Sequence, residues 1–438
     1  MKRILCLLLL ACLLLPYSRS LAADSDQNEL YFAAGLVSMA SYSDEVNLLT
    51  RQWLEESGWN FYTRENMNKA ADGRFHLVSR ELEGKVPVYL LAFPGTERLK
   101  DAEVDLRLSR VFFGGNTPEE FQRAAAEKGH SGSEPLVHHG FNDYTQGALF
   151  QKKLPAYENK TAGEVLAQEL QKHPDMVLYL TGHSLGGATA TLVAARLADM
   201  GVPASQLRVV TFGAPAVGNE AFARAYEHKM NLTRITIEGD PVKSVLQSLS
   251  GGFVQFGERV VWKKNRNSER FSHDMVVYLD QALRNYQDAN PDRSKTSAML
   301  NGQTKEIPGG IYVAPIQVAV DSHIQEDKKY MERSAADTLA VCYSPLTFAP
   351  AGKNSLEEWK AQAAAAGSRY ILAERFTASR IRRERYNFRL TMEEELYDTQ
   401  GNLLTMQTTS TTTNLLTPIE GMVYLQFKAK AQRDLFLK

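Results

Sequence analysis

The chain has 438 residues, of which 44% are hydrophobic and 23% are charged, and its formal net charge is −1. These proportions are those of an ordinary globular protein and exclude a disordered or low-complexity chain. A single hydrophobic core seldom serves a chain of this length, so we expect two domains.

The first 22 residues have the pattern of a secretory signal peptide. Two basic residues precede the apolar run 4–15, and the small residues that follow predict cleavage after Ala22 or Ala23. The alternative is a lipoprotein signal that would leave Cys12 lipidated, but Leu10 fits that pattern poorly and the apolar run continues past Cys12. No later stretch is long and apolar enough for a transmembrane helix. We therefore expect an exported protein that is periplasmic, attached to the cell envelope or secreted.

Removal of this peptide changes both the charge and the cysteine content. It takes away three cations and no acid, so the net charge of −1 becomes −4, which argues against a nucleic-acid partner. It also leaves Cys342 as the one cysteine of the mature chain, which excludes an internal disulfide. Because Cys342 lies in the apolar run 339–343, we expect a buried small hydrophobe rather than a reactive thiol.

Helical and strand patterns alternate between residues 23 and 290. Thr161 and Glu164 form a capping box that opens one of the helices. The alternation predicts an α/β fold with a mainly parallel sheet covered on both faces. The expected helices span 29–40, 45–56, 161–172 and 188–197, and the expected strands span 74–82, 86–93, 176–180, 207–212 and 232–237.

Polar residues, Pro291 and Gly302 replace this periodic pattern over 290–304, where we place a domain boundary. Residues 305–438 are expected to form a smaller C-terminal α+β domain, an accessory domain without a cluster of His, Cys or paired carboxylates. Its expected strands span 311–320, 370–376, 386–397 and 403–410, and its expected helices span 327–343 and 355–366.

The sequence 182–187, Gly-His-Ser-Leu-Gly-Gly, follows an apolar strand pattern and precedes an alanine-rich helical run. In this context a G-x-S-x-G turn holds the serine in a strained conformation that lifts its hydroxyl above the sheet. Side chains at Gly182 or Gly186 would collide in so tight a turn. The pattern therefore predicts that Ser184 is a nucleophile and that the Leu185 N–H, at a helix N-terminus, is one oxyanion donor.

A serine nucleophile needs a general base that is itself oriented by a carboxylate, and after such a turn the acid precedes the histidine in the chain. Asp240 follows the expected strand 232–237 in a Gly-Asp-Pro loop, and Glu238 is the fallback acid. Of the nine histidines, His273 alone lies between Asp240 and residue 290, so we assign it as the base. Asp274 is its sequence neighbour and is poorly placed to orient its ring.

The second oxyanion donor should come from the loop after an early strand. The expected strand 86–93 ends in Pro-Gly-Thr, and Gly95 lets the backbone turn toward the nucleophile, so we assign the Thr96 N–H. Farther along, the apolar segment 111–115 ends in two glycines. It fits a mobile lid over an acyl site and equally fits a buried anchor of an ordinary insertion.

Together these segments resemble the class 3 (fungal-type) lipase family of the α/β-hydrolases. The resemblance implies a lipase-like fold, ester hydrolysis on acyl glycerols or similar lipids, and the catalytic triad Ser184, Asp240 and His273. His138 and His183 match family positions that are structural, and Pro94 departs from the basic residue that many members carry. The matching segments are 93–96, 137–141, 182–187, 211–219, 240–242 and 273, which lie within residues 28–285.

We therefore expect a secreted serine carboxylic-ester hydrolase, a lipase or phospholipase that forms an acyl-enzyme and needs no metal or cofactor. Its partners would be a lipid or other ester substrate and, transiently, a membrane surface. One alternative is an envelope binding or assembly protein built on a hydrolase scaffold. It is suggested by a fold-level likeness of residues 305–438 to domains of bacterial envelope and transport-accessory proteins, and the intact triad argues against it. The other is an acyltransferase or thioesterase with the same triad.

Overall fold

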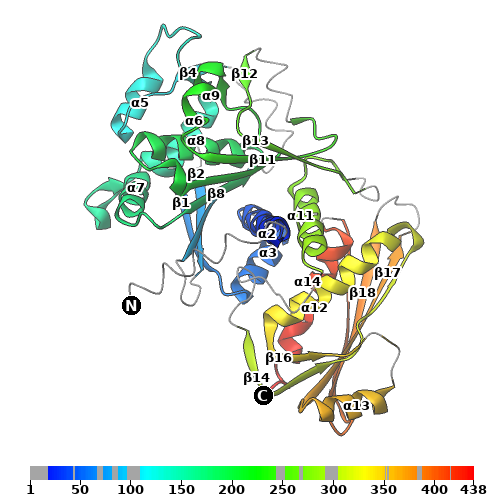
Figure 1. The fold of residues 1–438 in the computed structure, drawn as a ribbon. Helices are drawn as coiled ribbons and strands as arrows, with labels where there is room; N and C mark the ends of the chain where they lie inside the picture. Colours follow the sequence, from blue (N-terminus) through cyan, green and yellow to red (C-terminus); the bar gives the residue numbers. More distant parts are fainter. Residues whose placement is uncertain are drawn as a thin grey trace.

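The computed structural model describes residues 18–42, 45–66, 73–80, 87–95, 109–242, 252–265, 270–291, 304–350, 352, 355–381, 387–414 and 416–438. Within these ranges the chain forms two large sheets with a layer of helices between them (Figure 1).

The larger sheet has seven strands and carries the predicted parallel arrangement. In spatial order they are β1 (Asn60–Asn66), β2 (Gly73–Arg80), β3 (Val88–Phe93), β8 (Leu178–His183), β9 (Leu207–Phe212), β11 (Asn231–Ile237) and β13 (Glu258–Trp262). The pairs β1–β2 and β2–β3 are antiparallel. All pairs from β3 to β13 are parallel, which confirms the α/β class.

Helices cover both faces of this sheet because successive strand residues point to opposite sides. Leu90 and Ala92 of β3 join an apolar cluster with α2 (Ser18–Ala40), α3 (Glu45–Glu56) and α11 (Met275–Ala289). Leu91 and Phe93 join a second cluster on the opposite face. The helices of that second cluster are α5 (Pro118–Ala126), α6 (His139–Thr145), α7 (Ala162–Lys172), α8 (Leu185–Asp199) and α9 (Glu220–Tyr226).

Short strands make two further sheets beside the second cluster. One is ordered β12 (Phe253–Val254), β10 (Gly218–Asn219), β5 (Leu136–His138) and β4 (Arg110–Phe112), and the other pairs β6 (Lys153–Leu154) with β7 (Lys160–Thr161). Short 3-10 or π-helical segments lie at Gln146–Phe150, Pro155–Tyr157, Ala204–Gln206 and Ser322–Asp327, the last with a kink at Ile324.

The segment 111–115, a candidate lid in the sequence, is an anchor where it is described. Phe113 is 1% exposed, and the guanidinium of Arg196 lies 3.4 Å from the centre of its ring. Arg196 also donates to the carbonyl of Gly114 and to Asn142 Oδ1, at 2.9 and 3.2 Å. These contacts fix the segment to α8. The preceding residues 96–108 lie outside the described ranges.

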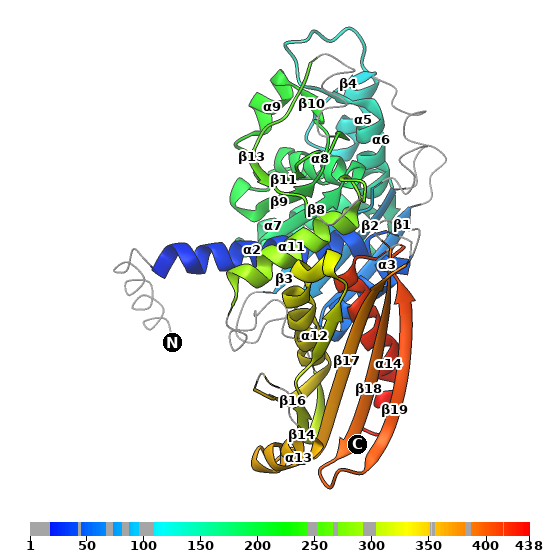
Figure 2. The same cartoon turned by 90° about the vertical axis from the view of Figure 1, so that its right-hand side faces the viewer.

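The second large sheet is ordered β16 (Tyr343–Phe348), β14 (Lys305–Val313), β17 (Tyr370–Arg380), β18 (Phe388–Asp398) and β19 (Leu403–Thr412), with β15 (Gln317–Val320) also paired to β17. Figure 2 shows its long strands extending away from the seven-stranded sheet. Its helices are α12 (Lys328–Cys342), α13 (Leu356–Ala365) and α14 (Pro418–Arg433). Side chains of α14 and β14 belong to the same apolar cluster as those of α2, so this core is continuous between the sheets.

Three features of this region differ from the sequence expectation, and one is strand β16, which follows α12 directly and was not predicted. The expected strand 311–320 is two strands, β14 and β15, because Pro315 between them has no N–H to donate to a ladder. Helix α14 was not predicted, although Thr417 and Glu420 form a capping box of the same kind as Thr161 and Glu164. Much of the predicted boundary, 292–303, lies outside the described residues, and the division into domains stays a prediction.

Three other expectations concern single segments. Cys342 is 1% exposed, and burial raises the pKa of its thiol to about 12, so it is a buried hydrophobe as predicted. None of the helices in the described ranges is long and apolar enough to cross a membrane. Of the predicted signal peptide 1–22, residues 1–17, Cys12 among them, lie outside the described part of the chain, and residues 18–22 are the start of α2.

Candidate active site

Ser184 lies in the turn between β8 and α8 and has a strained backbone. Its φ and ψ are 54° and −123°, and a non-glycine residue held there costs about 1–3 kcal/mol. Its N–H donates to the carbonyl of Phe212 on β9, at 3.0 Å. A Cβ at Gly182 would collide with the backbone of Gly186, and one at Gly186 would collide with the carbonyl of Phe93. The turn therefore needs both glycines.

Asp240 and His273 meet beside this turn, in loops that follow β11 and precede α11. His273 Nδ1 lies 2.9 and 3.1 Å from the two oxygens of Asp240, and the side chains of both are 0% exposed. Because a carboxylate can only accept, Nδ1 is the donor, and in the neutral ring the lone pair is then on Nε2. Nε2 is buried and has no hydrogen-bond partner in the described part of the chain. Asp240 Oδ1 also accepts from the Val242 N–H, at 2.9 Å.

Tyr278 on α11 is a member of this cluster that the sequence analysis missed. Its hydroxyl donates to Asp240 Oδ2 at 2.5 Å and accepts from the Ile237 N–H at 3.2 Å. Burial and the neighbouring Asp240 raise the pKa of Tyr278 far above its ordinary value, so the phenol stays a donor. Tyr278 lies in the apolar run 275–279, and nothing in its local sequence distinguishes it from a core tyrosine.

His183 holds the backbone of the loop that carries His273. Its Nε2 lies 2.7 Å from the carbonyl of His273, so that nitrogen must be the donor. Burial, with His273 nearby, lowers the pKa of His183 well below its usual value, so the ring is neutral. Nδ1 then accepts from the Tyr42 hydroxyl, at 2.5 Å. These two hydrogen bonds connect Tyr42, which follows the end of α2, through His183 to the loop that carries His273.

The structure describes one of the two predicted oxyanion donors, Leu185. Leu185 is the first residue of α8, so its N–H has no acceptor within that helix. Thr96 lies outside the described residues. The preceding Gly95 approaches the turn closely, because a Cβ there would lie 2.7 Å from the carbonyl of His183.

The remaining candidates have other contacts. Glu238, the fallback acid, is exposed, and Asp274 begins α11 without a hydrogen bond to the His273 ring. His138 accepts from the Phe141 N–H at the start of α6 and stacks on the Phe141 ring, and burial lowers the pKa of His138 to about 4. No group of three metal-ligating side chains gathers within the described ranges.

Comparisons with known proteins agree with the predicted resemblance to class 3 lipases. Residues 90–248 match the model of the lipase (class 3) family. A lipase of Caenorhabditis elegans is 44% identical over 78 residues, which are 17% of this chain and 22% of that protein. The secreted mono- and diacylglycerol lipase A of Penicillium cyclopium is 35% identical over 121 residues, 28% of this chain and 37% of that protein.

A solved structure of the Rhizomucor miehei triacylglyceride lipase covers 54% of this chain and 80% of its own, at 21% identity and a TM-score of 0.39. A TM-score of that size is too low to argue from, so the assignment depends on the sequence matches. Those matches span less than two fifths of the length of both curated relatives. The matched residues 90–248, which include Ser184 and Asp240, are similar to the class 3 lipase family.

Proposed function

We propose that this chain hydrolyses carboxylic esters of acyl glycerols through an acyl-enzyme on Ser184. The observation that carries the proposal is the buried hydrogen bond between His273 Nδ1 and Asp240, next to a strained serine at a helix N-terminus. In such a dyad the carboxylate fixes the imidazole tautomer, and the lone pair of Nε2 can accept a proton.

In the proposed reaction, Ser184 Oγ bonds to the ester carbonyl carbon while His273 Nε2 takes the hydroxyl proton. The same proton then passes to the alcohol oxygen, the C–O bond breaks, and the glycerol part leaves. Water repeats the sequence on the acyl-enzyme and releases the fatty acid. The N–H groups of Leu185 and Thr96 would stabilise the oxyanion at each addition. Contacts between nucleophile and base are often long without substrate and shorten when it binds.

A lipid substrate is supported by the names of the relatives and by the surface beside His273. The Phe271 ring is 49% exposed and lies 6.2 Å from the His273 ring, which places an apolar side chain at the base. Export is part of the proposal, since the N-terminal pattern is that of a signal peptide and the Penicillium relative is named as secreted.

The test is hydrolysis of a chain-length series of nitrophenyl esters, followed by emulsified glycerides and phospholipid vesicles. We expect turnover by the wild type and none by Ser184→Ala, while Ser205→Ala, an exposed serine far from the turn, serves as the matched control. The glyceride and phospholipid arms assign the head group. If neither ester nor lipid is hydrolysed by folded wild-type protein, the proposal is wrong and the scaffold alternative replaces it.

A separate measurement addresses export. The intact mass of the protein recovered from the envelope should correspond to loss of residues 1–22 and should be the same for Cys12→Ser. A lipid-sized mass increase that disappears in Cys12→Ser would instead establish the lipoprotein alternative.

A further inference from the structure

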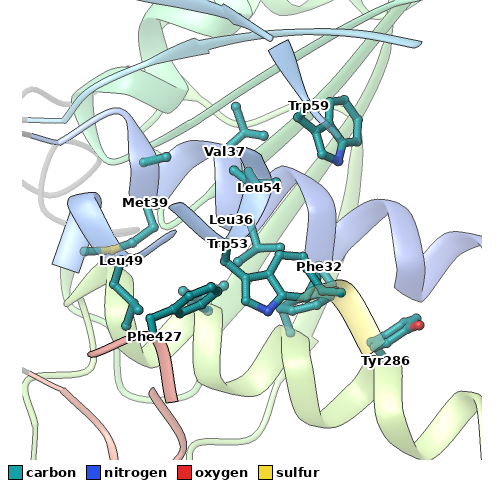
Figure 3. Packing of buried hydrophobic residues seen from close by; sticks show 14 of the residues in the cluster. Phe32, Leu36, Val37, Met39, Leu49, Trp53, Leu54, Trp59, Tyr286 and Phe427 are labelled. Atoms are coloured by element: carbon teal, nitrogen blue, oxygen red, sulfur yellow. The ribbon is translucent and has the colours of Figure 1, made fainter. Parts of the chain in front are cut away.

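Helix α11, which follows the base, is fixed by close packing between the two large sheets. The Tyr286 ring of α11 is stacked on the Phe32 ring of α2 with ring centres 5.3 Å apart, and the Phe32 ring meets Trp53 of α3 edge-on at 5.9 Å (Figure 3). The loop before α11, which carries His273, has a different environment. Phe271 in this loop is 49% exposed, and loops are more mobile than the elements that they connect. The loop therefore needs anchors of its own.

Arg270 anchors this loop to the C-terminal region. Its Nη2 donates to the carbonyl of Thr413 at 2.9 Å and to the carbonyl of Leu416 at 3.0 Å. Both acceptors lie in the connection between β19 and α14, which is 143 and 146 positions farther along the chain. A guanidinium NH2 group carries two protons, so one nitrogen can serve both carbonyls. The anchor is three residues before His273.

The segment that accepts from Arg270 is itself well held. The Thr413 N–H donates to the carbonyl of Phe388 at 3.0 Å, and the Thr413 hydroxyl accepts from the Phe388 N–H at 2.9 Å. Thr417, the buried N-cap of α14, follows Leu416 directly. Hydrogen bonds from a charged donor are about twice as strong as neutral ones. The C-terminal region therefore offers the guanidinium two fixed acceptors.

Two further hydrogen bonds hold the loop from the side of the seven-stranded sheet. The carbonyl of His273 accepts from His183 Nε2 at 2.7 Å, and the carbonyl of Arg270 accepts from Lys264 Nζ at 2.5 Å. His183 ends β8, and Lys264 follows β13. The backbone around the base is thus fixed from both regions of the chain, and Arg270 supplies the contact with the C-terminal one.

We propose that Arg270 is a positioning residue that holds the His273 loop where Nε2 can reach Ser184, an inference that rests on the proposed function. Asp240 fixes the tautomer of the ring, but the direction of Nε2 also depends on the backbone that carries the ring. A displacement of about 1 Å at a catalytic group costs about 100-fold in rate. Because the anchors from the seven-stranded sheet remain when the guanidinium is removed, we expect a smaller loss, of about tenfold.

The test compares Arg270→Met with the wild type in steady-state hydrolysis of a nitrophenyl ester. Methionine fills a similar space and donates nothing, so kcat should fall about tenfold. KM should change by less than about twofold, since Arg270 contacts the protein and not the substrate. Arg333→Met is the matched control, because Arg333 Nη1 donates to the carbonyl of Asn290, at the other end of α11, at 2.9 Å. A wild-type kcat in folded Arg270→Met, or an equal loss in Arg333→Met, would overturn the proposal.

A spectroscopic measurement separates this inference from the proposed activity. A histidine Nδ1–H bonded to a carboxylate gives a far-downfield proton NMR signal, which is recorded on the free protein without any ester. The signal of His273 is assigned by its loss in His273→Gln, and we expect it to shift or broaden in Arg270→Met but not in Arg333→Met.

The two readouts give distinguishable failures. If the wild type hydrolyses no ester and the signal still changes in Arg270→Met, the proposed function fails and the positioning of the dyad stands. If the wild type is active and Arg270→Met keeps both kcat and the signal, the positioning role of Arg270 alone is wrong. Arg270→Gln, whose side chain is too short to reach both carbonyls, gives the same comparison if Arg270→Met does not fold.

Discussion

Gly213 is the position where one added methyl group would test the candidate dyad directly. It follows β9 and has a φ of 57°. A Cβ there would lie 2.8 Å from Asp240 Oδ2, 2.9 Å from the Tyr278 hydroxyl oxygen and 3.0 Å from His273 Nδ1. All three atoms are buried, and Asp240 Oδ2 accepts from both the Tyr278 hydroxyl and His273 Nδ1, so a shift of any one of them disturbs a hydrogen bond.

The size of the effect follows from these distances. An ordinary contact of a Cβ atom is 3.4 Å or more, so the dyad must move by roughly half an ångström in Gly213→Ala. A displacement of about 1 Å at a catalytic group costs about 100-fold in rate, so we expect kcat/KM to fall by about 10- to 100-fold. Overpacking costs about 1–3 kcal/mol of stability, and the left-handed backbone costs alanine about 1–2 kcal/mol more.

Gly367→Ala separates the backbone cost from the collision. Gly367 has a φ of 68°, and a Cβ there would meet nothing within 4 Å. The two variants are compared by kcat/KM on a nitrophenyl ester and by thermal unfolding. We expect Gly367→Ala to lose stability alone and Gly213→Ala to lose both. If folded Gly213→Ala keeps wild-type kcat/KM, the Asp240 and His273 pair does not act in catalysis.

Four further variants or reactions test single contacts. Tyr278→Phe removes a donor to Asp240 worth about 1.5–3 kcal/mol, so kcat should fall about tenfold or more in steady-state assays, and an unchanged kcat would contradict this. Arg196→Met leaves two buried acceptors without a donor, and urea unfolding should show a loss of about 2 kcal/mol. Cys342 should react with a thiol reagent only after unfolding, because burial raises its pKa to about 12, and labelling of the folded chain would refute this. Burial and Glu394 raise the pKa of Glu374 from 4.5 to about 8. The folded chain therefore loses stability as pH rises between these values, and Glu374→Gln should flatten that decline in unfolding measured against pH.

The parts of the site that the sequence predicts are those with a local pattern. The turn around Ser184 could be identified because its two glycines, the strand before it and the helix after it are contiguous in the chain. Asp240 and His273 could be assigned from their order after the serine, since each lies in a loop at an element end. Their hydrogen bond spans 33 positions and could be predicted only as a consequence of that order.

The parts that the sequence does not predict depend on contacts between distant segments. Tyr42 and His183 are 141 positions apart, and Tyr278 reaches Asp240 from the middle of an apolar run. The local sequence around each tyrosine forms no motif that would predict a hydrogen bond to Asp240 or His183. Helix α14, by contrast, could have been predicted from its local sequence, because a capping box at Thr417 opens it.

Helix α11 connects the candidate site to the second sheet. Its first turns carry Tyr278, and one turn later Arg284 pairs with Asp280 at 2.7 Å and with Asp327, at the start of α12, at 3.1 Å. The hydroxyl of Thr417, the N-cap of α14, donates to Asp280 at 3.1 Å.

These charges are buried, so loss of the residues after 305 would leave Arg284 without one carboxylate and would expose the apolar face that α11 turns toward α12 and α14. The C-terminal region therefore stabilises the helix that orients Asp240, and its contribution to the site is structural even though it lends no side chain to the dyad.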